Sequence, residues 1–158
     1  MTHKIKKQPI LVPVDFSPCS EEALLYAANL AASLRFPLTV LHVVHDPNEM
    51  PGYYAKLAKK KTLTRIEDVA REMFDEFVAH TAKQHPELKA LKKLETTLVT
   101  GIPTTRILEM VEKLNAGMVV MGSKGRTGLK HLLVGSIAEH IVQLCPVPVT
   151  IVKAEQNK

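Results

Sequence analysis

The glycine-punctuated stretch between Gly122 and Ser136 holds the residues of this chain best suited to chemistry. Gly122 and Gly125 follow a short apolar run, and Gly135-Ser136 come after nine further residues. Glycine adopts backbone angles closed to other residues and exposes its amide. Ser136 followed by Glu139 is typical of a capping box, so we expect Ser136 to be the N-cap of a helix whose first N–H groups attract anions. The stretch therefore predicts a phosphate cradle.

The residues alone leave a second interpretation open, in which the glycines serve only to turn the chain. A P-loop needs four residues between its glycines and then Gly-Lys-Ser/Thr, whereas two separate Gly122 from Gly125 and Lys130 follows five positions later. The dinucleotide fingerprint needs a glycine where Lys124 stands. Lys124, Arg126 and Lys130 could each neutralise a phosphate charge or be solvated surface cations.

A second polar loop follows the first apolar run of the chain. Asp15 ends this run, and Ser17-Pro18 is typical of a helix N-cap followed by proline. Asp15 therefore suits either helix capping or ligand binding. The order of residues yields no Ser/His/Asp set and no carboxylate pair for catalysis. It leaves any metal site undetermined, because the histidines share no metal-ligand spacing and are expected in the core or on the surface: His42, His131 and His140.

Apolar runs alternate with helical periods along the whole chain. We expect strands over 10–14, 38–44, 94–100, 118–121 and 148–152, and helices over about 18–34, 63–83, 103–114 and 136–144. The expected inward residues of the last helix are Ile137, Ile141 and Leu144, and those of the helix 63–83 are Ile66, Val69, Ala70, Met73, Phe77 and Val78. Right-handed crossovers make this an α/β fold with five parallel strands, a doubly wound, Rossmann-like sheet covered by helices on both faces. Ligands of such sheets bind beyond the carboxyl ends of the strands, where the strand order reverses.

The length and composition fit a single domain over residues 1–158. Hydrophobic residues make up 46% of the chain, enough for one core, which we place over residues 8–153. A variable loop from Asp46 to Lys61 contains two prolines and a glycine and has no clear period, and residues 154–158 form a polar tail. The loop is longer than a compact domain usually carries without a use.

Charge and cysteine content exclude several functional classes. The net charge of +5 is spread over short lysine clusters without interleaved aromatic residues, so we expect no nucleic-acid partner. Cys19 and Cys145 form no paired framework, which favours a reducing, cytoplasmic location. The first apolar run is too short for a signal peptide, and no stretch is long and apolar enough for a membrane span.

The order of motifs resembles the universal stress protein family, in particular its ATP-binding branch. That branch carries the pattern G-x2-G-x9-G-(S/T) after its fourth strand, which Gly122, Gly125, Gly135 and Ser136 match without a gap. The resemblance extends over nearly the whole chain, through Pro13-Val14-Asp15-Phe16-Ser17, Leu41-His42-Val43, Gly101-Ile102-Pro103 and Pro146-Val147-Pro148-Val149. It implies the strand order 3-2-1-4-5 of the adenine nucleotide alpha hydrolase-like folds.

The resemblance also implies which residues bind a nucleotide. Pro13, Val14 and Asp15 would lie near the base and ribose, and the backbone of Val43 would meet adenine. The ribose and phosphates would lie against residues of the glycine stretch: Met121, Gly122, Ser123, Lys124, Gly125, Arg126, Gly135, Ser136 and Ile137. Gly122 and Gly135 are expected in a loop or at a helix start, with their open sides toward the phosphates.

The leading hypothesis is a stress-response or regulatory protein that binds ATP or AMP, with Mg²⁺ entering through the nucleotide phosphates and an unknown protein partner reading the bound state. The alternative is a slow ATP hydrolase or phosphoryl-transfer enzyme, for which the sequence offers no water-positioning residue. A structural protein without nucleotide, or a flavodoxin-like carrier, fits the glycines and loops less well. We also expect a homodimer, because the family pairs its last strands and the apolar strand that begins at Val147 and ends at Val152 would otherwise be a bare edge.

Overall fold

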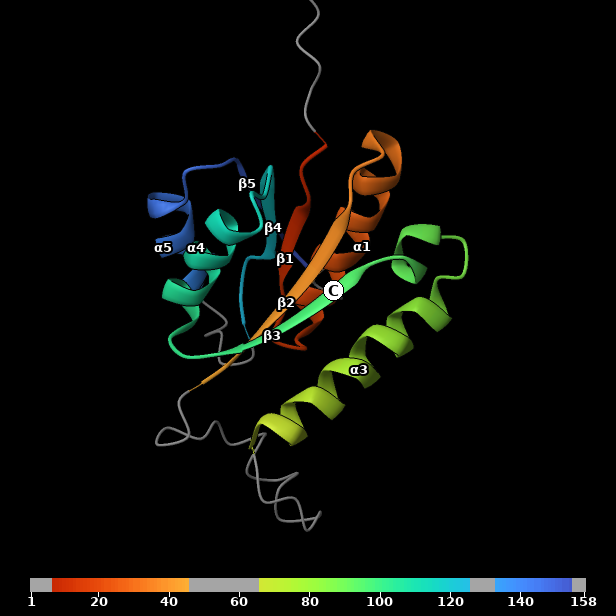
Figure 1. The fold of residues 1–158 in the computed structure, drawn as a ribbon, viewed down its shortest axis with the longest axis horizontal. Helices are drawn as coiled ribbons and strands as arrows, with labels where there is room; N and C mark the ends of the chain where they lie inside the picture. Colours follow the sequence, from red (N-terminus) through yellow and green to blue (C-terminus); the bar gives the residue numbers. More distant parts are fainter. Residues whose placement is uncertain (1–6, 46–65, 126–132, 155–158) are drawn as a thin grey trace, which may run out of the picture.

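The computed structural model describes residues 7–45, 66–125 and 133–154, in which strands and helices alternate as expected (Figure 1). The elements are β1 (Ile10–Pro13), α1 (Pro18–Leu34), β2 (Leu38–Val44), α3 (Ile66–Gln84), the short 3-10 helix η2 (Lys89–Lys92), β3 (Glu95–Thr100), α4 (Pro103–Lys113), β4 (Met118–Gly122), α5 (Ser136–Leu144) and β5 (Val149–Val152). The predicted elements differ from these by small shifts at their ends, and η2 was not predicted. The loop from Asp46 to Lys61 lies outside the described residues, as do Arg126, Lys130 and His131.

The sheet has five parallel strands in the order β3-β2-β1-β4-β5, which confirms the expected topology. Ile10 of β1 pairs with Leu38 of β2 on one side and with Met118 of β4 on the other. The strand order therefore reverses between β1 and β4. The chain leaves β1 toward one face of the sheet, through α1, and leaves β4 toward the other, through α5 (Figure 1). This divergence opens space above the carboxyl ends of β1 and β4.

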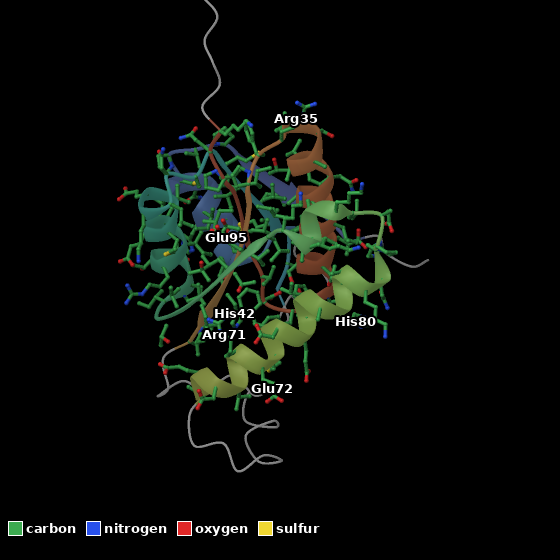
Figure 2. All side chains as sticks on the ribbon, turned by 45° about the vertical axis from the view of Figure 1, so that its right-hand side comes forward. Arg35, His42, Arg71, Glu72, His80 and Glu95 are labelled. Carbon is green, nitrogen blue, oxygen red and sulfur yellow. The ribbon has the colours of Figure 1, made fainter. Side chains whose placement is uncertain are left out.

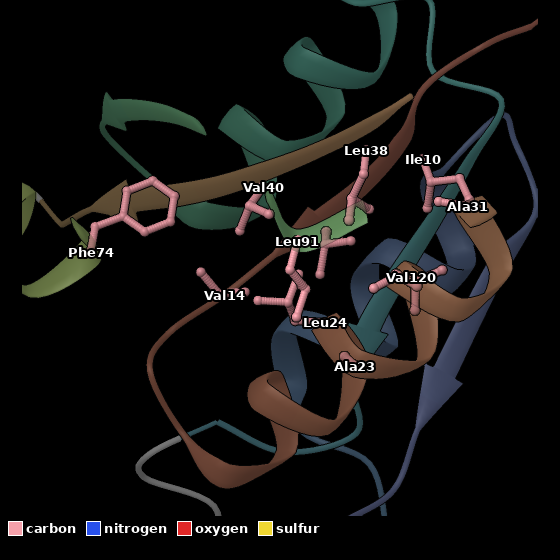
Figure 3. Close-up of a cluster of buried hydrophobic side chains, with 13 residues drawn as sticks. Ile10, Val14, Ala23, Leu24, Ala31, Leu38, Val40, Phe74, Leu91 and Val120 are labelled. Atoms are coloured by element: carbon pink, nitrogen blue, oxygen red, sulfur yellow. The ribbon is translucent and has the colours of Figure 1, made fainter. Parts of the chain in front are cut away.

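Two apolar clusters hold the helices on the two faces of the sheet. On one face, buried residues of β1, β2 and β4 pack against α1, α3 and η2, with Leu24, Phe74 and Leu91 as their large contacts (Figure 3). On the other face, Leu11 and Val119 pack against α4 and α5. The sheet is thus covered on both sides, as parallel strands require.

The predicted inward residues were partly wrong in the two helices that lie toward the sheet edges. The fully buried aromatic residue of α3 is Phe74, whereas Phe77 is half-buried, because the buried stripe runs through Ala70, Phe74 and Thr81. In α5, Ile137 and Leu144 are 37% and 60% exposed, and the buried stripe is Ala138 and Ile141. These are residues three apart on one helix face, so α5 presents a narrow stripe to the sheet.

Helix α1 begins as the sequence predicts. Ser17 is its N-cap, with Oγ accepting the Ser20 N–H at 3.2 Å, and Pro18 is its first residue. Cys19 in the first turn of α1 and Cys145 at the end of α5 are both free thiols.

Candidate functional site

A cavity of about 620 Å³ lies at the carboxyl ends of β1, β2 and β4. Its walls come from the loop after β1, the end of β2, the first turns of α4 and α5, and the loop that follows β4. Every expected site residue within the described part of the chain lines it: Pro13, Val14, Asp15, Val43, Met121, Gly122, Ser123, Lys124, Gly125, Gly135, Ser136 and Ile137. The fold therefore gathers three segments that are far apart in sequence at the point where the strand order reverses.

The loop after β1 is fixed through its backbone by β2. The Val14 N–H donates to the Leu41 carbonyl at 2.8 Å, and the Val14 carbonyl accepts from Nδ1 of His42 at 2.7 Å. Because a carbonyl oxygen only accepts, Nδ1 must carry a proton. Phe16 then adopts φ of 66°, a left-handed conformation that costs a bulky residue about 1–2 kcal/mol. Its ring stacks on that of His42 with centroids 4.2 Å apart, which helps to hold it there.

Asp15 is placed between the two loops that form the cavity. Its Oδ1 accepts the Ser17 N–H at 3.1 Å, so it supports the start of α1 as the capping interpretation predicted. Its Oδ2 lies so close to Gly125 that a Cβ atom on that glycine would be 2.6 Å away. The position of this carboxylate therefore depends on the absence of a side chain at residue 125.

Gly122 differs from the expectation that it opens toward a ligand. It is the buried last residue of β4, and a Cβ there would lie 2.8 Å from the backbone carbon of Cys19 in α1. Glycine is required here because β4 and the first turn of α1 approach too closely for a side chain. The Ser123 N–H then donates to the Val152 carbonyl at 2.8 Å, which fixes the start of the next loop to β5.

The start of α5 corrects the predicted capping box. The N-cap is Gly135, in extended conformation, and Ser136 is the first helical residue, with no side-chain capping bond. The Gly135 N–H donates to the Ser123 carbonyl at 2.6 Å and so ties the start of α5 to the loop after β4. The first bond of the α5 ladder comes from the Glu139 N–H to the Gly135 carbonyl, which leaves the amides of Ser136 and Ile137 ahead of it.

The electrostatics of this end of the cavity favour an anion. The N-terminal turn of a helix carries a partial positive charge in addition to its unpaired N–H groups. Lys124 adds a cationic side chain to the cavity wall, whereas Arg126 lies outside the described residues. Asp15 supplies an acidic group to the same cavity, with Oδ2 beside Gly125. The cavity thus has one end suited to a negatively charged group and an acceptor suited to hydroxyl groups.

Sequence reasoning missed a further set of lining residues. The start of α4 contributes Ile102, Pro103, Thr104 and Ile107, and the first turn of α1 contributes Ser20. The end of β2 and the residue after it contribute Leu41, His42 and His45, and α5 contributes Ala138 and His140. The signal for α4 was available, because Gly101-Ile102-Pro103 follows a strand and all parallel strands end at the same edge. The histidines had no such signal, since their places depend on how helix and strand approach each other.

Comparisons with known proteins give the family. The model of the universal stress protein family matches residues 7–153. The chain belongs to the universal stress protein family. Universal stress protein MJ0531 of Methanocaldococcus jannaschii is 31% identical over 149 residues, which cover 94% of this chain and 84% of the relative.

Solved structures of universal stress proteins share the fold. UspA from Lactobacillus plantarum superimposes with a TM-score of 0.71 at 23% identity, covering 93% of this chain and 98% of that protein. A universal stress protein in complex with cAMP gives 0.62 at 18% identity, with coverages of 94% and 98%. A third, from Archaeoglobus fulgidus in complex with dAMP, gives 0.54 at 20% identity, with coverages of 92% and 98%.

The described residues contain neither a membrane-spanning helix nor a cluster of metal ligands. None of the helices in ranges 7–45, 66–125 and 133–154 combines the length and apolar character needed to cross a membrane. Within the same ranges, no three His, Cys, Asp or Glu side chains are grouped so that they could hold a metal ion.

Proposed function

We propose that this universal stress protein binds an adenine nucleotide, ATP or AMP, in the cavity at the carboxyl ends of β1, β2 and β4. The observation that carries the proposal is the convergence of Asp15, Gly125 and the start of α5 on one cavity at the strand-order reversal. Relatives of the same fold that are described in complex with cAMP and dAMP support the adenine part of the ligand.

The base and ribose would occupy the end of the cavity formed by β1 and β2. Pro13, Val14 and Met121 supply apolar walls, and the backbone of Val43 at the end of β2 would meet the edge of adenine. The Asp15 carboxylate would accept hydrogen bonds from ribose hydroxyls, which charged acceptors bind more strongly than neutral ones do.

The phosphates would lie between the loop after β4 and the start of α5. Gly125 lets the loop approach closely, and the amides of Ser136 and Ile137 precede the first bond of the helix ladder. Lys124 would neutralise part of the charge, and Arg126 would add to it from the same loop. Three further residues shape this end of the cavity. The Gly135 N–H is bonded to the Ser123 carbonyl, and Gly122 packs against α1.

Magnesium fits this site as a companion of the phosphates. The described residues form no cluster of three ligands for it, so the nucleotide and water would supply most of its oxygen ligands, with Asp15 as a protein ligand. When bound, the ion would neutralise phosphate charge.

We propose further that the nucleotide acts as a regulatory ligand read by a protein partner, in a homodimer joined through the strand from Val147 to Val152. β5 lies at the sheet edge, paired with β4 alone among the described strands, and its residues are half-buried. Beside it on α5, Val142 and Leu144 are 52% and 60% exposed. An apolar edge strand and exposed apolar side chains together suit pairing with a second copy.

Two measurements on the wild-type protein test the binding proposal. Mass spectrometry of the denatured, untagged protein should find ATP or AMP released from it. Calorimetry of the nucleotide-free protein should then show one site per chain for ATP. GTP should bind much more weakly, because the Val43 backbone would meet the edge of the base, where guanine differs from adenine. A folded protein that shows no heat with ATP or AMP would refute the proposal.

A further inference from the structure

One polar side chain interrupts the apolar stripe of β2. Leu38, Val40 and Val44 alternate on the sheet face that packs against α1 and α3, and His42 occupies the position between the last two. His42 is 2% exposed. Burying an imidazole is unfavourable unless its polar atoms are hydrogen-bonded. His42 should therefore make an interaction that an aliphatic residue could not make.

The contacts of His42 reach from β2 to the loop after β1. Its Nδ1–H donates to the Val14 carbonyl at 2.7 Å, and its ring contacts Phe16 of the loop and Phe74 of α3, with centroids 4.2 Å and 6.0 Å away. The centroids of the two phenyl rings are 6.1 Å apart, so the three rings form a triangle. Figure 2 shows His42 on the side of the sheet that α3 covers. Phe16 also contacts Phe77 of α3, at 5.5 Å between centroids. The imidazole is therefore the polar centre of an aromatic cluster beneath the loop.

These contacts act on three consecutive residues of the candidate site. Val14 is held by its carbonyl, and Phe16 by its ring in a left-handed conformation that few bulky residues adopt. Asp15 lies between them, so both of its neighbours are fixed by the same imidazole. Its carboxylate reaches the Ser17 N–H on one side and the surface of Gly125 on the other.

We infer that His42 is a positioning residue, which holds residues 14–16 in the conformation that directs the Asp15 carboxylate into the nucleotide cavity. The inference rests on the proposed nucleotide site for its effect on binding, but the placement of the loop is independent of any ligand. His42 itself acts from beneath the loop, through the Val14 carbonyl and the Phe16 ring.

A matched pair of variants separates this role from general packing. His42→Asn places an amide nitrogen where Nδ1 lies and can donate to Val14, whereas His42→Gln carries the same amide one methylene further out. We expect His42→Gln to weaken ATP binding about five- to tenfold in calorimetry. His42→Asn keeps the bond to Val14 but loses the stack on Phe16, so we expect it to weaken binding only about two- to threefold. Phe74→Leu is the packing control, because it contacts the same rings but not the Val14 carbonyl. It should lower the melting temperature and leave the affinity for ATP unchanged.

Amide hydrogen exchange of the nucleotide-free protein gives the readout that does not depend on a ligand. Exchange at Ser17, whose N–H is bonded to Asp15, should accelerate about tenfold in His42→Gln and remain near wild type in His42→Asn. Equal effects of Asn and Gln on both readouts, or no effect of Gln on either, would overturn the inference. If the exchange result holds while the wild-type protein binds no nucleotide, the loop-positioning role stands and the proposed function fails.

Discussion

Gly125→Ala isolates the contribution of Asp15 to nucleotide binding. A Cβ at residue 125 would lie 2.6 Å from Oδ2 of Asp15, closer than a Cβ atom normally comes to a non-bonded atom. The atom that must move is the end of a side chain and not backbone, so the carboxylate turns away and the fold remains. Turning it breaks the bond from the Ser17 N–H to Oδ1 and removes the acceptor from the ribose.

The expected magnitudes differ sharply between stability and binding. Losing the Ser17 bond costs about 0.5–1.5 kcal/mol, and replacing glycine by alanine returns about 0.4–1 kcal/mol through the unfolded state, so stability changes little. Losing a charged hydrogen bond to the ligand costs about 1.5–3 kcal/mol, which corresponds to a roughly ten- to hundredfold weaker ATP affinity. Calorimetry with ATP and differential scanning calorimetry measure the two quantities on the same samples.

Gly117→Ala is the matched control for this variant. A Cβ there would lie 2.9 Å from Cβ of Gln8, which moves only with its backbone, but Gly117 precedes β4 at the end of the sheet opposite the cavity. It should lower stability more than Gly125→Ala does, because the backbone at Gln8 must shift, and it should leave ATP affinity as in wild type. An unchanged affinity in a folded Gly125→Ala protein would refute the role of Asp15, and an equal loss in Gly117→Ala would show that the effect is not local.

Four further predictions test the remaining parts of the site and the assembly. Gly135→Val should fold, because residue 135 has φ of −75° and an added Cβ would lie 3.4 Å from its nearest neighbouring atom. It should weaken ATP binding more than about tenfold in calorimetry by filling the phosphate end of the cavity. Wild-type affinity would mean that the glycine stretch is only a turn. Ser136→Ala should weaken ATP binding only about two- to tenfold. Its melting temperature should be unchanged because Ser136 makes no capping bond, and a large fall in that temperature would contradict Gly135 as the N-cap. Gly122→Ala should destabilise the protein by about 1–3 kcal/mol in urea unfolding, because the new Cβ meets the Cys19 backbone, and full stability would exclude that close approach. Light scattering should give twice the 17.5 kDa chain mass at tens of micromolar, whereas a monomer mass would remove the proposed β5 pairing.

The sequence was sufficient for the fold because its signals are local. Apolar runs bounded by polar residues, glycine or proline mark the strands, and Ser17-Pro18 marks the start of α1, where the structure confirms a Ser17 cap. The alternation then leaves few topologies, since parallel crossovers are right-handed. The strand order, which periodicity does not encode, came from the family resemblance and agrees with the sheet.

The sequence predictions were wrong where a shift of one residue, or a contact with a residue far away in the sequence, determines the local structure. Gly135 and Ser136 both suit a helix N-cap, and the bond from the Gly135 amide to the Ser123 carbonyl selects the earlier one. The packing of Gly122 on Cys19 and of Gly125 on Asp15 joins residues more than a hundred positions apart, which no local pattern reveals. Phe74 and Phe77 lie one helical turn apart, and only the docking of α3 determines which is buried.

His42 carried no functional signal in the sequence, because its contacts also depend on residues far away in the chain. A histidine within a strand is usually satisfied in the core, and the lack of metal-ligand spacing gave no other reason to single it out. Its importance follows from the 2.7 Å bond to Val14 and the left-handed turn at Phe16, both of which exist only in the folded chain.

A crystal structure of the protein grown with ATP tests the central claim most directly. We expect the adenine ring beside the Val43 backbone, the ribose hydroxyls on the Asp15 carboxylate, and the phosphates between Gly125 and the amides of Ser136 and Ile137. Nucleotide bound elsewhere on the chain, or an empty cavity at a saturating ATP concentration, would contradict it.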